Sequence, residues 1–338
     1  KVRNTMQLLS TTDIDIEIAA NALRNGRLVA IPTETVYGLG ANAFDERAVA
    51  AVFEAKERPT FDPLIVHIAR LEDITVLAEN VPEKAWALAK NLWPGPLTLI
   101  LPKRREVPDI VTAGLPTVAV RFPSHPIAQK IIARATVPVA APSANPFGYL
   151  SPTTAAHVVA MLGERIDYVV DGGPCEVGVE STVIDMTSEP PTLLRPGGMP
   201  LERIEALIGH VDVLQHASQE QQGLKSPGLS ISHYAPSTPL FLFDEGSLPA
   251  AAQKLEIVHP CVALAFDGQR AQCFKDSGLF DETQVLSEKG DMREAAARLF
   301  SLLHDLDLLG FVAIYAERVP DVGLGRAIND RLYRASRK

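Results

Sequence analysis

Short apolar runs, most of them bounded by proline, glycine or aspartate, are the feature that most constrains the fold of this 338-residue chain. Runs of this length, bounded by residues that favour turns, are typical of buried strands. In the first two thirds of the chain they predict strands at Leu28–Ile31, Leu64–Ile68, Leu97–Leu101, Val118–Phe122, Val137–Ala141, Tyr168–Val170 and Thr182–Ile184. Between them, apolar residues at helical spacing predict helices over Asp45–Lys56, Glu83–Trp93 and His125–Arg134.

The order of these elements predicts an α/β protein with two domains. Strands outnumber helices in residues 1–213 and several strands follow one another directly, so we expect a mixed, twisted sheet with flanking helices. Residues 214–238 are polar and rich in Gln, Ser and Pro, which indicates a linker. Residues 239–338 predict a small α/β domain with a parallel sheet, from elements at Leu240–Phe243, Val262–Phe266, Met292–Leu306, Phe311–Tyr315 and Gly325–Ser336.

Charge and cysteine content exclude several classes of protein. With 32 basic and 41 acidic residues the net charge is −9, so nucleic acids and anionic membranes are repelled overall, and a bound polyanion must meet a local basic pocket. The three cysteines form no C-x-x-C pair, which argues against a disulfide scaffold and a cysteine-rich zinc site. No apolar run approaches the roughly 18 residues that span a bilayer. We therefore expect a cytoplasmic enzyme with no membrane partner.

Polar side chains gather in two stretches beside expected strands. Residues 32–40 read PTETVYGLG and follow a strand, so Thr33 and Thr35 stand where α/β sheets bind ligands; a capped turn is the alternative interpretation. Residues 56–67 read KERPTFDPLIVH, in which Lys56 and Arg58 suit a polyphosphate, although a helix C-terminus alone also favours cations. His67, inside the next strand, is on its own more typical of a core histidine.

A third polar stretch and two buried arginines complete the candidates. Residues 141–146 read APSANP, where Ser143 and Asn145 can face a ligand or only initiate a turn. Arg121 and Arg195 lie in apolar surroundings, where each guanidinium needs an anion, either a ligand or a structural carboxylate. No Walker loop, dinucleotide-binding loop, zinc-protease motif or nucleophile elbow is present. The expected chemistry therefore relies on positioning and charge stabilisation, with no metal held by protein side chains.

The order and spacing of four motifs resemble the YrdC-like domain: PTETVYGLG, K-x-R-P-x-x-x-P-L-I-V-H, W-P-G-P-L-T and S-x-N. The later SPGLSISHYAP and GLGRAINDRLYRAS resemble the long, two-domain form of the threonylcarbamoyl-AMP synthase family. The resemblance spans residues 6–337. It implies that L-threonine, bicarbonate and ATP are joined into threonylcarbamoyl-AMP and diphosphate, with Mg²⁺ assisting. It also implies that the product passes to a transferase that makes N6-threonylcarbamoyladenosine in tRNA.

The resemblance also assigns residues to the two substrates. Lys56 and Arg58 are expected to bind the triphosphate and to be the catalytic residues. The remaining ATP contacts are expected from Thr60, Thr117, Ser143, Asn145, Ser151 and Arg195, with His233 and Tyr234 of the linker closing over the nucleotide as a lid. Threonine is expected to contact Thr33, Thr35, His67, Arg121, Ser181 and the backbone of Ala141.

Two positions depart from the family pattern. Glu57 stands between Lys56 and Arg58, where Gly or Asn is common, and we expect its side chain to face solvent. The linker has Ser-Ile-Ser before His233 instead of a basic residue, which predicts looser closure over the nucleotide. Two other functions stay open: an RNA-binding module, because YrdC-like domains have a basic concavity that could accept double-stranded RNA, and a carbamoyltransferase-type enzyme that contains the same domain. The resemblance also allows a weak contact with tRNA.

Overall fold

The computed structural model describes residues 6–214, 234–244, 246–247 and 257–337. The chain forms two compact units. Unit 1 comprises residues 1–147, 151–176 and 180–229, and unit 2 comprises residues 148–150, 177–179 and 230–338. Two short segments from the first two thirds of the chain therefore belong to the same unit as the C-terminal third.

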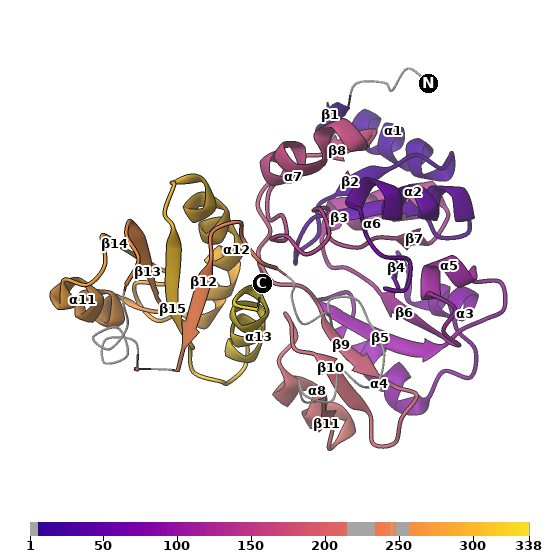
Figure 1. The fold of residues 1–338 in the computed structure, drawn as a ribbon. Helices are drawn as coiled ribbons and strands as arrows, with labels where there is room; N and C mark the ends of the chain where they lie inside the picture. The colour runs from indigo at the N-terminus through magenta and orange to yellow at the C-terminus, as the bar shows by residue number, and fades with distance from the viewer. Residues whose placement is uncertain (1–5, 215–233, 245, 248–256, 338) are drawn as a thin grey trace. The chain divides into compact units, whose positions relative to one another are not determined.

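The described part of unit 1 contains one sheet of eleven strands in the order β1-β8-β2-β3-β7-β4-β6-β5-β9-β10-β11 (Figure 1). Both orientations occur: β4 runs parallel to β6, whereas β5 runs antiparallel to β6. This confirms the expected mixed sheet. The strands are β1 (Gln7–Leu9), β2 (Val29–Ile31), β3 (Gly38–Asn42), β4 (Ile65–His67), β5 (Leu97–Pro102), β6 (Thr117–Arg121), β7 (Val139–Ala140), β8 (Tyr168–Val170), β9 (Thr182–Asp185), β10 (Thr192–Arg195) and β11 (Asp212–Val213).

Helices flank this sheet, and α1 packs on α6 while α4 packs on α8. The predicted start of α2 is confirmed, because Asp45 Oδ1 accepts hydrogen bonds from the N–H groups of Arg47 (2.9 Å) and Ala48 (3.3 Å). The α-helices are α1 (Asp13–Arg24), α2 (Glu46–Lys56), α3 (Ile74–Leu77), α4 (Glu83–Leu92), α5 (Asp109–Thr112), α6 (Pro126–Ala135), α7 (Ala155–Leu162) and α8 (Leu201–Ile208), and the 3₁₀-helices are η1 (Leu71–Asp73) and η2 (Gly163–Arg165).

The two faces of the sheet carry different side chains because neighbouring residues of a strand point to opposite faces. In β4, β5 and β6, residues such as Val66, Leu99 and Val120 belong to the large apolar core that also contains α2 and α4. Their neighbours Ile100 and Ala119 belong to a small apolar cluster on the opposite face. Among the polar residues considered below, His67, Thr98 and Arg121 of these three strands point to this second face.

Strand β3 was not predicted, and the reason is its glycines. The run Gly38-Leu39-Gly40-Ala41-Asn42 lacks the β-branched residues that mark a strand. A Cβ atom on Gly40 would lie 3.0 Å from Val139 Cγ1 and 3.1 Å from the Val29 carbonyl oxygen. Gly40 therefore permits β2 and β7 to approach β3 closely. The sequence interpretation also missed β1, β10 and β11.

Unit 2 is a small α/β domain, as predicted. Its described strands form a sheet in the order β12-β15-β13-β14, and every pairing is parallel. The prediction missed α11 and β14. The elements are β12 (Leu240–Phe243), β13 (Cys261–Ala265), α11 (Gly268–Ser277), β14 (Glu282–Val285), α12 (Met292–Leu308), β15 (Ala313–Glu317) and α13 (Gly325–Ala335).

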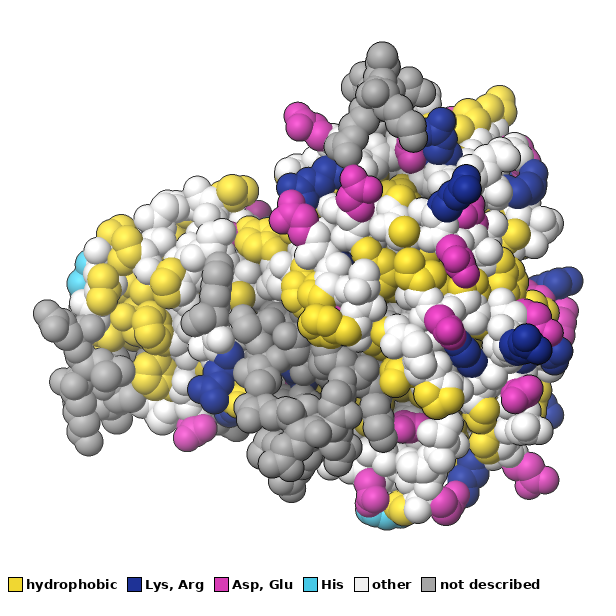
Figure 2. All heavy atoms as spheres, turned by 45° about the vertical axis from the view of Figure 1, so that its right-hand side comes forward, with side chains coloured by type: hydrophobic (Ala, Val, Ile, Leu, Met, Phe, Trp, Pro, Cys, Tyr) yellow, Lys and Arg dark blue, Asp and Glu magenta, His cyan; other side chains and the backbone are white. Residues whose placement is uncertain are grey.

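The charges on unit 1 are mixed on the face seen in Figure 2, where acidic and basic side chains lie interspersed between hydrophobic ones. That face has no large patch of a single sign, which a nucleic-acid surface would require. Among the described residues, no helix combines the length and the hydropathy needed to cross a membrane.

Candidate active site

A polar row crosses three neighbouring strands on the second face of the unit 1 sheet. His67 at the end of β4 and Thr98 in β5 both stand opposite Arg121 at the end of β6. Side chains at opposed positions of a sheet point to the same face. All three residues are at least 95% buried. The sheet register thus places an imidazole, a guanidinium and a hydroxyl side by side.

The loop between β2 and β3 covers this row with its own polar groups. Arg121 Nη2 lies 2.8 Å from Glu34 Oε1 and donates a second hydrogen bond to Thr35 Oγ1 at 2.9 Å. Thr33 Oγ1 lies 2.9 Å from the Thr35 hydroxyl and donates to the Val36 carbonyl at 2.6 Å. Glu34 Oε2 and Arg121 Nε are buried and have no partner among the described residues. Buried polar atoms without partners are uncommon, and these two belong to residues that are paired with each other, which makes the pair a candidate ligand site.

Burial controls the protonation of this region. Burial and the nearby Arg121 charge lower the pKa of His67 to about 3, so its imidazole is neutral at physiological pH. His67 Nδ1 is a further buried atom that lacks a partner in the described chain. Burial also raises the pKa of Cys175 to about 12, with the Glu34 carboxylate as a smaller cause. The Cys175 thiol is therefore not activated as a nucleophile.

Ser181, which precedes β9, extends the row toward Arg195 at the end of β10. Its hydroxyl lies 2.8 Å from Thr98 Oγ1, and its carbonyl oxygen accepts a hydrogen bond from Arg195 Nη2 at 2.9 Å. Ser151 Oγ hydrogen bonds to the buried Glu180 carboxylate immediately before Ser181. The polar groups on this side of the sheet are thus connected to one another.

Lys56, at the C-terminus of α2, is fully buried. Its Nζ donates to the carbonyl oxygens of Ser143 (2.5 Å) and Asn145. Burial, followed by repulsion from Arg58, holds the pKa of Lys56 well below its usual value. An ammonium group has three N–H donors. Two have these acceptors, and the described residues provide none for the third.

Arg58 and Asp62 form a buried ion pair beside Lys56. Arg58 Nη2 lies 2.9 Å from Asp62 Oδ2 and donates to the Pro63 carbonyl at 3.0 Å. Asp62 is completely buried, and burial raises its pKa, while the charges of Arg58, Lys56 and Arg195 act in the opposite direction. The Asp62 carboxylate thus lies close enough to all three basic side chains to be stabilised by their charges.

The loop at 141–147 joins this cation cluster (Lys56, Arg58 and Arg195) to the β2–β3 loop. Gly38 forms a β-bridge with Ser143, and the Ala144 N–H donates to the Tyr37 carbonyl at 2.8 Å. The Phe147 N–H donates to the Lys56 carbonyl at 2.8 Å. This loop therefore contacts α2 at Lys56 and the β2–β3 loop at Tyr37 and Gly38, and Ser181 contacts both Thr98 of the polar row and Arg195 of the cation cluster.

Family models match nearly the whole chain. A model of the Sua5–YciO–YrdC domain, described as telomere recombination, matches residues 21–197, and a model described as the threonylcarbamoyl-AMP synthase C-terminal domain matches residues 199–337. The chain belongs to the threonylcarbamoyl-AMP synthase family. This confirms the family resemblance stated from the sequence.

Individual members of the threonylcarbamoyl-AMP synthase family are similar over full length. The synthase of Pyrococcus abyssi (strain GE5 / Orsay) is 47% identical over 322 residues, covering 95% of this chain and 94% of that protein. The synthase of Bacillus subtilis (strain 168) is 44% identical over 334 residues, covering 97% and 94%. The crystal structure of P. abyssi Sua5 complexed with L-threonine superposes with a TM-score of 0.88 at 42% identity, covering 98% of each chain.

Not every residue expected from the family pattern joins the polar groups just described. Thr60 is exposed, and Thr117 is half-buried at the start of β6. The side chain of Thr117 points to the same face of the sheet as that of Arg121. The two residues lie about 13 Å apart along β6, at 3.3 Å per residue. Tyr234 belongs to unit 2, where its ring packs on Phe300 and under Arg331. His233 lies outside the described residues.

Glu57 occupies the position where the family often has Gly or Asn, and its geometry explains that preference. Its φ of 53° lies in the left-handed region, which those residues adopt most easily. Its carboxylate is exposed and lies 2.7 Å from Arg165 Nη1. The expected solvent-facing orientation is confirmed, and Glu57 takes no part in the cation cluster.

Sequence analysis missed three residues of the site: Glu34, Asp62 and Thr98. Glu34 and Asp62 each lie inside a motif that was singled out, but neither was assigned a role. The available signal was the chemistry of buried arginines, which need a carboxylate. Thr98 lies in the W-P-G-P-L-T motif, but its place opposite Arg121 depends on strand register, which the motif does not reveal.

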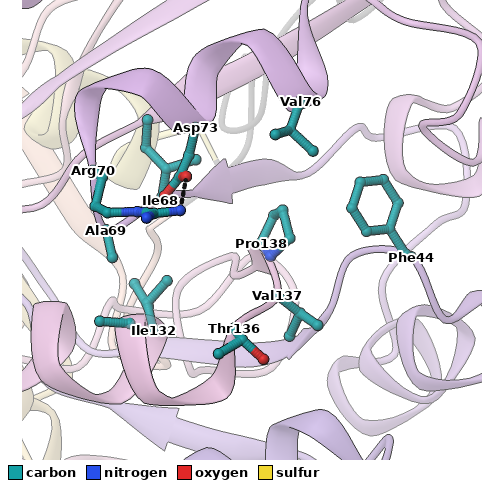
Figure 3. A pocket seen from close by; sticks show the side chains of 11 residues that line it. Phe44, Ile68, Ala69, Arg70, Asp73, Val76, Ile132, Thr136, Val137 and Pro138 are labelled. Carbon is teal, nitrogen blue, oxygen red and sulfur yellow. Dashed lines mark hydrogen bonds and ion pairs between the residues drawn. The ribbon is translucent and has the colours of Figure 1, made fainter.

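A pocket of about 440 Å³ lies elsewhere in unit 1 and is mainly apolar (Figure 3). Phe44, Val76 and Pro138 line it, and the exposed ion pair between Arg70 and Asp73 borders it. None of the residues discussed above lines this pocket. The presence of this pocket is therefore not sufficient to identify it as the active site.

Proposed function

We propose that this chain joins L-threonine, bicarbonate and ATP into threonylcarbamoyl-AMP, releasing diphosphate. The names of its full-length relatives and the threonine complex of the P. abyssi protein support the proposal. The observation that carries it is the presence in unit 1 of two buried polar groups that Ser181 connects, through its hydroxyl to Thr98 and through its carbonyl oxygen to Arg195. The cation cluster suits a triphosphate, and the Arg121–Glu34 pair suits an amino acid.

Threonine binds against the polar row of β4 and β6. Arg121 Nε, which lacks a partner, donates to the threonine carboxylate, and Glu34 Oε2 accepts from its amino or hydroxyl group. Neutral His67 adds an uncharged hydrogen-bonding group. The Ala141 N–H already donates to the Ile65 carbonyl at 2.9 Å, so the Ala141 carbonyl oxygen is the backbone atom that faces the substrate. The remaining contacts come from Thr33, Thr35 and Ser181.

ATP binds with its phosphates against Lys56, Arg58 and Arg195. The remaining Lys56 N–H donor and the two guanidinium groups compensate the phosphate charge in a site where burial strengthens electrostatic interactions. Thr117 extends the same sheet face beyond Arg121. The other proposed nucleotide contacts are Thr60, Ser143, Asn145, Ser151, His233 and Tyr234.

The reaction depends on the alignment of the bound substrates more than on a chemically reactive side chain. The threonine amine attacks carbon dioxide derived from bicarbonate, and a carbamate oxygen then attacks the α-phosphorus as diphosphate leaves. The cation cluster stabilises the charge that develops on the leaving diphosphate, and Arg121 holds the nucleophile beside it. The raised pKa of Cys175 is consistent with a mechanism that has no covalent enzyme intermediate.

Mg²⁺ enters this scheme bound to the phosphates of ATP. The buried carboxylates Glu34 and Asp62 are already paired with Arg121 and Arg58. Because Mg²⁺ commonly keeps several waters and uses phosphate oxygens, it needs no additional protein ligand. Bound there, Mg²⁺ would neutralise part of the phosphate charge.

Three segments divide the work: a catalytic domain at 1–213, a linker at 214–238, and a supporting α/β domain at 239–338. The lid role expected of the linker falls mainly on residues 215–233, which lie outside the described residues. The product is an activated carbamoyl group, which a separate transferase passes to adenosine in tRNA. The enzyme acts in the cytoplasm.

Diphosphate release from ATP tests this function. Release should require both threonine and bicarbonate. An RNA-binding module would release none, and a carbamoyltransferase would need carbamoyl phosphate. Lys56→Met and Arg58→Ala should lower the rate at least about 100-fold, since each removes a charged contact to phosphate. Lys130→Met, at an exposed position of α6, is the matched control. Release that ignores threonine would contradict the proposal.

A further inference from the structure

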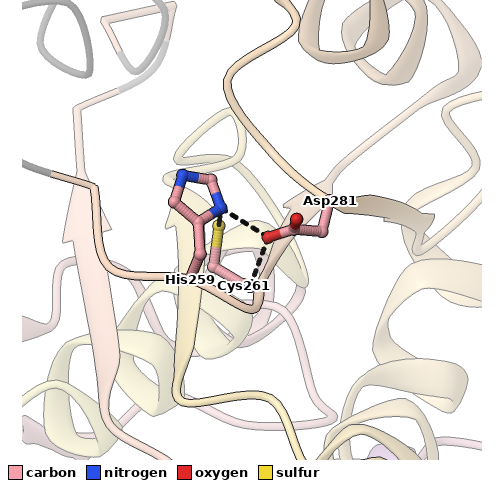
Figure 4. A group of neighbouring side chains, drawn as sticks. All are labelled: His259, Cys261 and Asp281. Carbon is pink, nitrogen blue, oxygen red and sulfur yellow. Dashed lines mark hydrogen bonds and ion pairs between the residues drawn. The ribbon is translucent and has the colours of Figure 1, made fainter.

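Three potential metal ligands meet at the N-terminal edge of the unit 2 sheet (Figure 4). Cys261 is the first residue of β13, and Asp281 directly precedes β14. These strands are parallel neighbours, with Val262 opposite Glu282, so Cys261 and Asp281, one residue earlier in each chain segment, lie side by side. His259 lies two residues before Cys261 and 22 residues before Asp281. The sheet register brings together ligands that their spacing in the sequence does not reveal.

The contacts among the three side chains are short. His259 Nδ1 lies 2.6 Å from Asp281 Oδ2 and 3.8 Å from Cys261 Sγ. The Cys261 N–H donates to the same Asp281 oxygen at 2.8 Å, which fixes the carboxylate. The three ligand atoms lie within 4.8 Å of one another. Imidazole nitrogen, thiolate sulfur and carboxylate oxygen are the protein ligands of zinc.

A catalytic Cys-His-Asp triad would have a different geometry. In a triad the imidazole uses one nitrogen for the nucleophile and the other for the carboxylate. Here Cys261 Sγ and Asp281 Oδ2 both approach the same atom, Nδ1. The arrangement converges on one point, as metal ligands do.

We propose that His259, Cys261 and Asp281 bind a zinc-class divalent cation, with a solvent molecule as fourth ligand. Bond lengths of about 2.0–2.3 Å in a tetrahedral site separate ligand atoms by about 3.3–3.6 Å. The sulfur–nitrogen distance of 3.8 Å is close to that range, and the nitrogen–oxygen pair needs to open by less than 1 Å. The thiol proton leaves to solvent, and the imidazole carries its hydrogen on Nε2.

The surroundings leave room for a cation to enter. The side chains of His259 and Asp281 are 53% and 45% exposed, while Cys261 is buried at the start of the strand. Two ligands can thus adjust around a fixed third. The site uses none of the residues proposed to bind threonine or ATP, so its occupancy is independent of the proposed function.

The chain offers matched controls for each ligand type. Cys273 is an exposed free cysteine in the same unit. His210 of unit 1 is an exposed histidine whose Nε2 lies 3.0 Å from Asp212 Oδ1, with no thiol in the group. Metal that binds through any exposed thiol or any histidine–carboxylate pair would also involve these residues.

Titration of the full-length protein with Co²⁺, a spectroscopic probe for zinc sites, tests the proposal. We expect a thiolate-to-cobalt absorption band that saturates at about one ion per chain and disappears when Zn²⁺ is added. Cys261→Ser should abolish the band. His259→Asn and Asp281→Asn should weaken Co²⁺ binding at least about tenfold. Cys273→Ser and His210→Asn should leave it unchanged.

A second measurement avoids dependence on variants that fold poorly. In the wild-type chain, Zn²⁺ should protect Cys261 from alkylation by iodoacetamide while Cys273 still reacts, as mapped by mass spectrometry. The absence of a thiolate band, or a band that depends on Cys273, would overturn the proposal. Equal alkylation of Cys261 with and without Zn²⁺ would overturn it as well.

Discussion

At the scale of single residues, Arg121 is the residue whose substitution most directly distinguishes threonine binding from ATP binding. It is fixed by Glu34 and Thr35, and its Nε remains for a ligand. Arg121→Ala should weaken threonine binding about 10–100-fold, the effect of one lost charged hydrogen bond, and leave ATP affinity nearly unchanged. Calorimetric titration with each substrate measures both. Arg134→Ala, at a surface pair with Asp13, is the control. Equal loss of both affinities would reject this role.

Lys56 predicts a specific pH dependence. Its lowered pKa means that the free protein loses this ammonium charge at a lower pH than an exposed lysine does. Phosphates favour the charged form, so ATP binding at alkaline pH should take up a proton and weaken as pH rises through that pKa. Calorimetry in two buffers with different ionisation enthalpies measures the uptake. Lys56→Met should abolish it, and an unchanged uptake would contradict the assignment.

Asp62 balances part of the charge of the cation cluster before ATP binds. Asp62→Ala leaves Arg58 buried without its carboxylate, which should lower the free energy of unfolding by about 3–5 kcal/mol. Bound ATP supplies replacement negative charge. The difference in melting temperature between variant and wild type should therefore shrink at saturating ATP, as thermal scans can show. A difference that ATP does not change would contradict this explanation.

At the scale of elements, the C-terminus of α2 positions Lys56 and Arg58 through a strained residue. Glu57 adopts a left-handed conformation that costs a non-glycine residue about 1–2 kcal/mol. Glu57→Gly should raise the free energy of unfolding by about 1 kcal/mol, measured by urea denaturation. Glu57→Ala keeps the strain and serves as the control. If the glycine variant is no more stable than the alanine variant, the strain is not significant.

The elements also show what sequence patterns can and cannot predict. The start of α2 followed from Asp45, because capping depends on residues close in sequence. Strand β3 could not be predicted in the same way, since Gly38 and Gly40 are suited to close contacts with strands that are distant in sequence. Local chemistry was sufficient where the determining partners are local.

At the scale of the whole molecule, the site depends on sheet order. Strand β4 lies between β7 and β6, and β9 lies beside β5, an arrangement that apolar runs alone do not specify. The motif residues Lys56, Arg58 and Arg121 were recognisable by residue type and family pattern. Their buried partners Glu34 and Asp62, and Thr98 opposite Arg121, could be given roles once register and packing placed them.

One measurement tests the central claim most directly: a crystal structure of the full-length protein with threonine and a non-hydrolysable ATP analogue. The account predicts phosphate oxygens within hydrogen-bond distance of Lys56 and Arg58, and the threonine carboxylate on Arg121. Both ligands should lie on the same face of the unit 1 sheet. Phosphates bound away from the cation cluster, for example in the pocket beside Phe44 and Pro138, would contradict it.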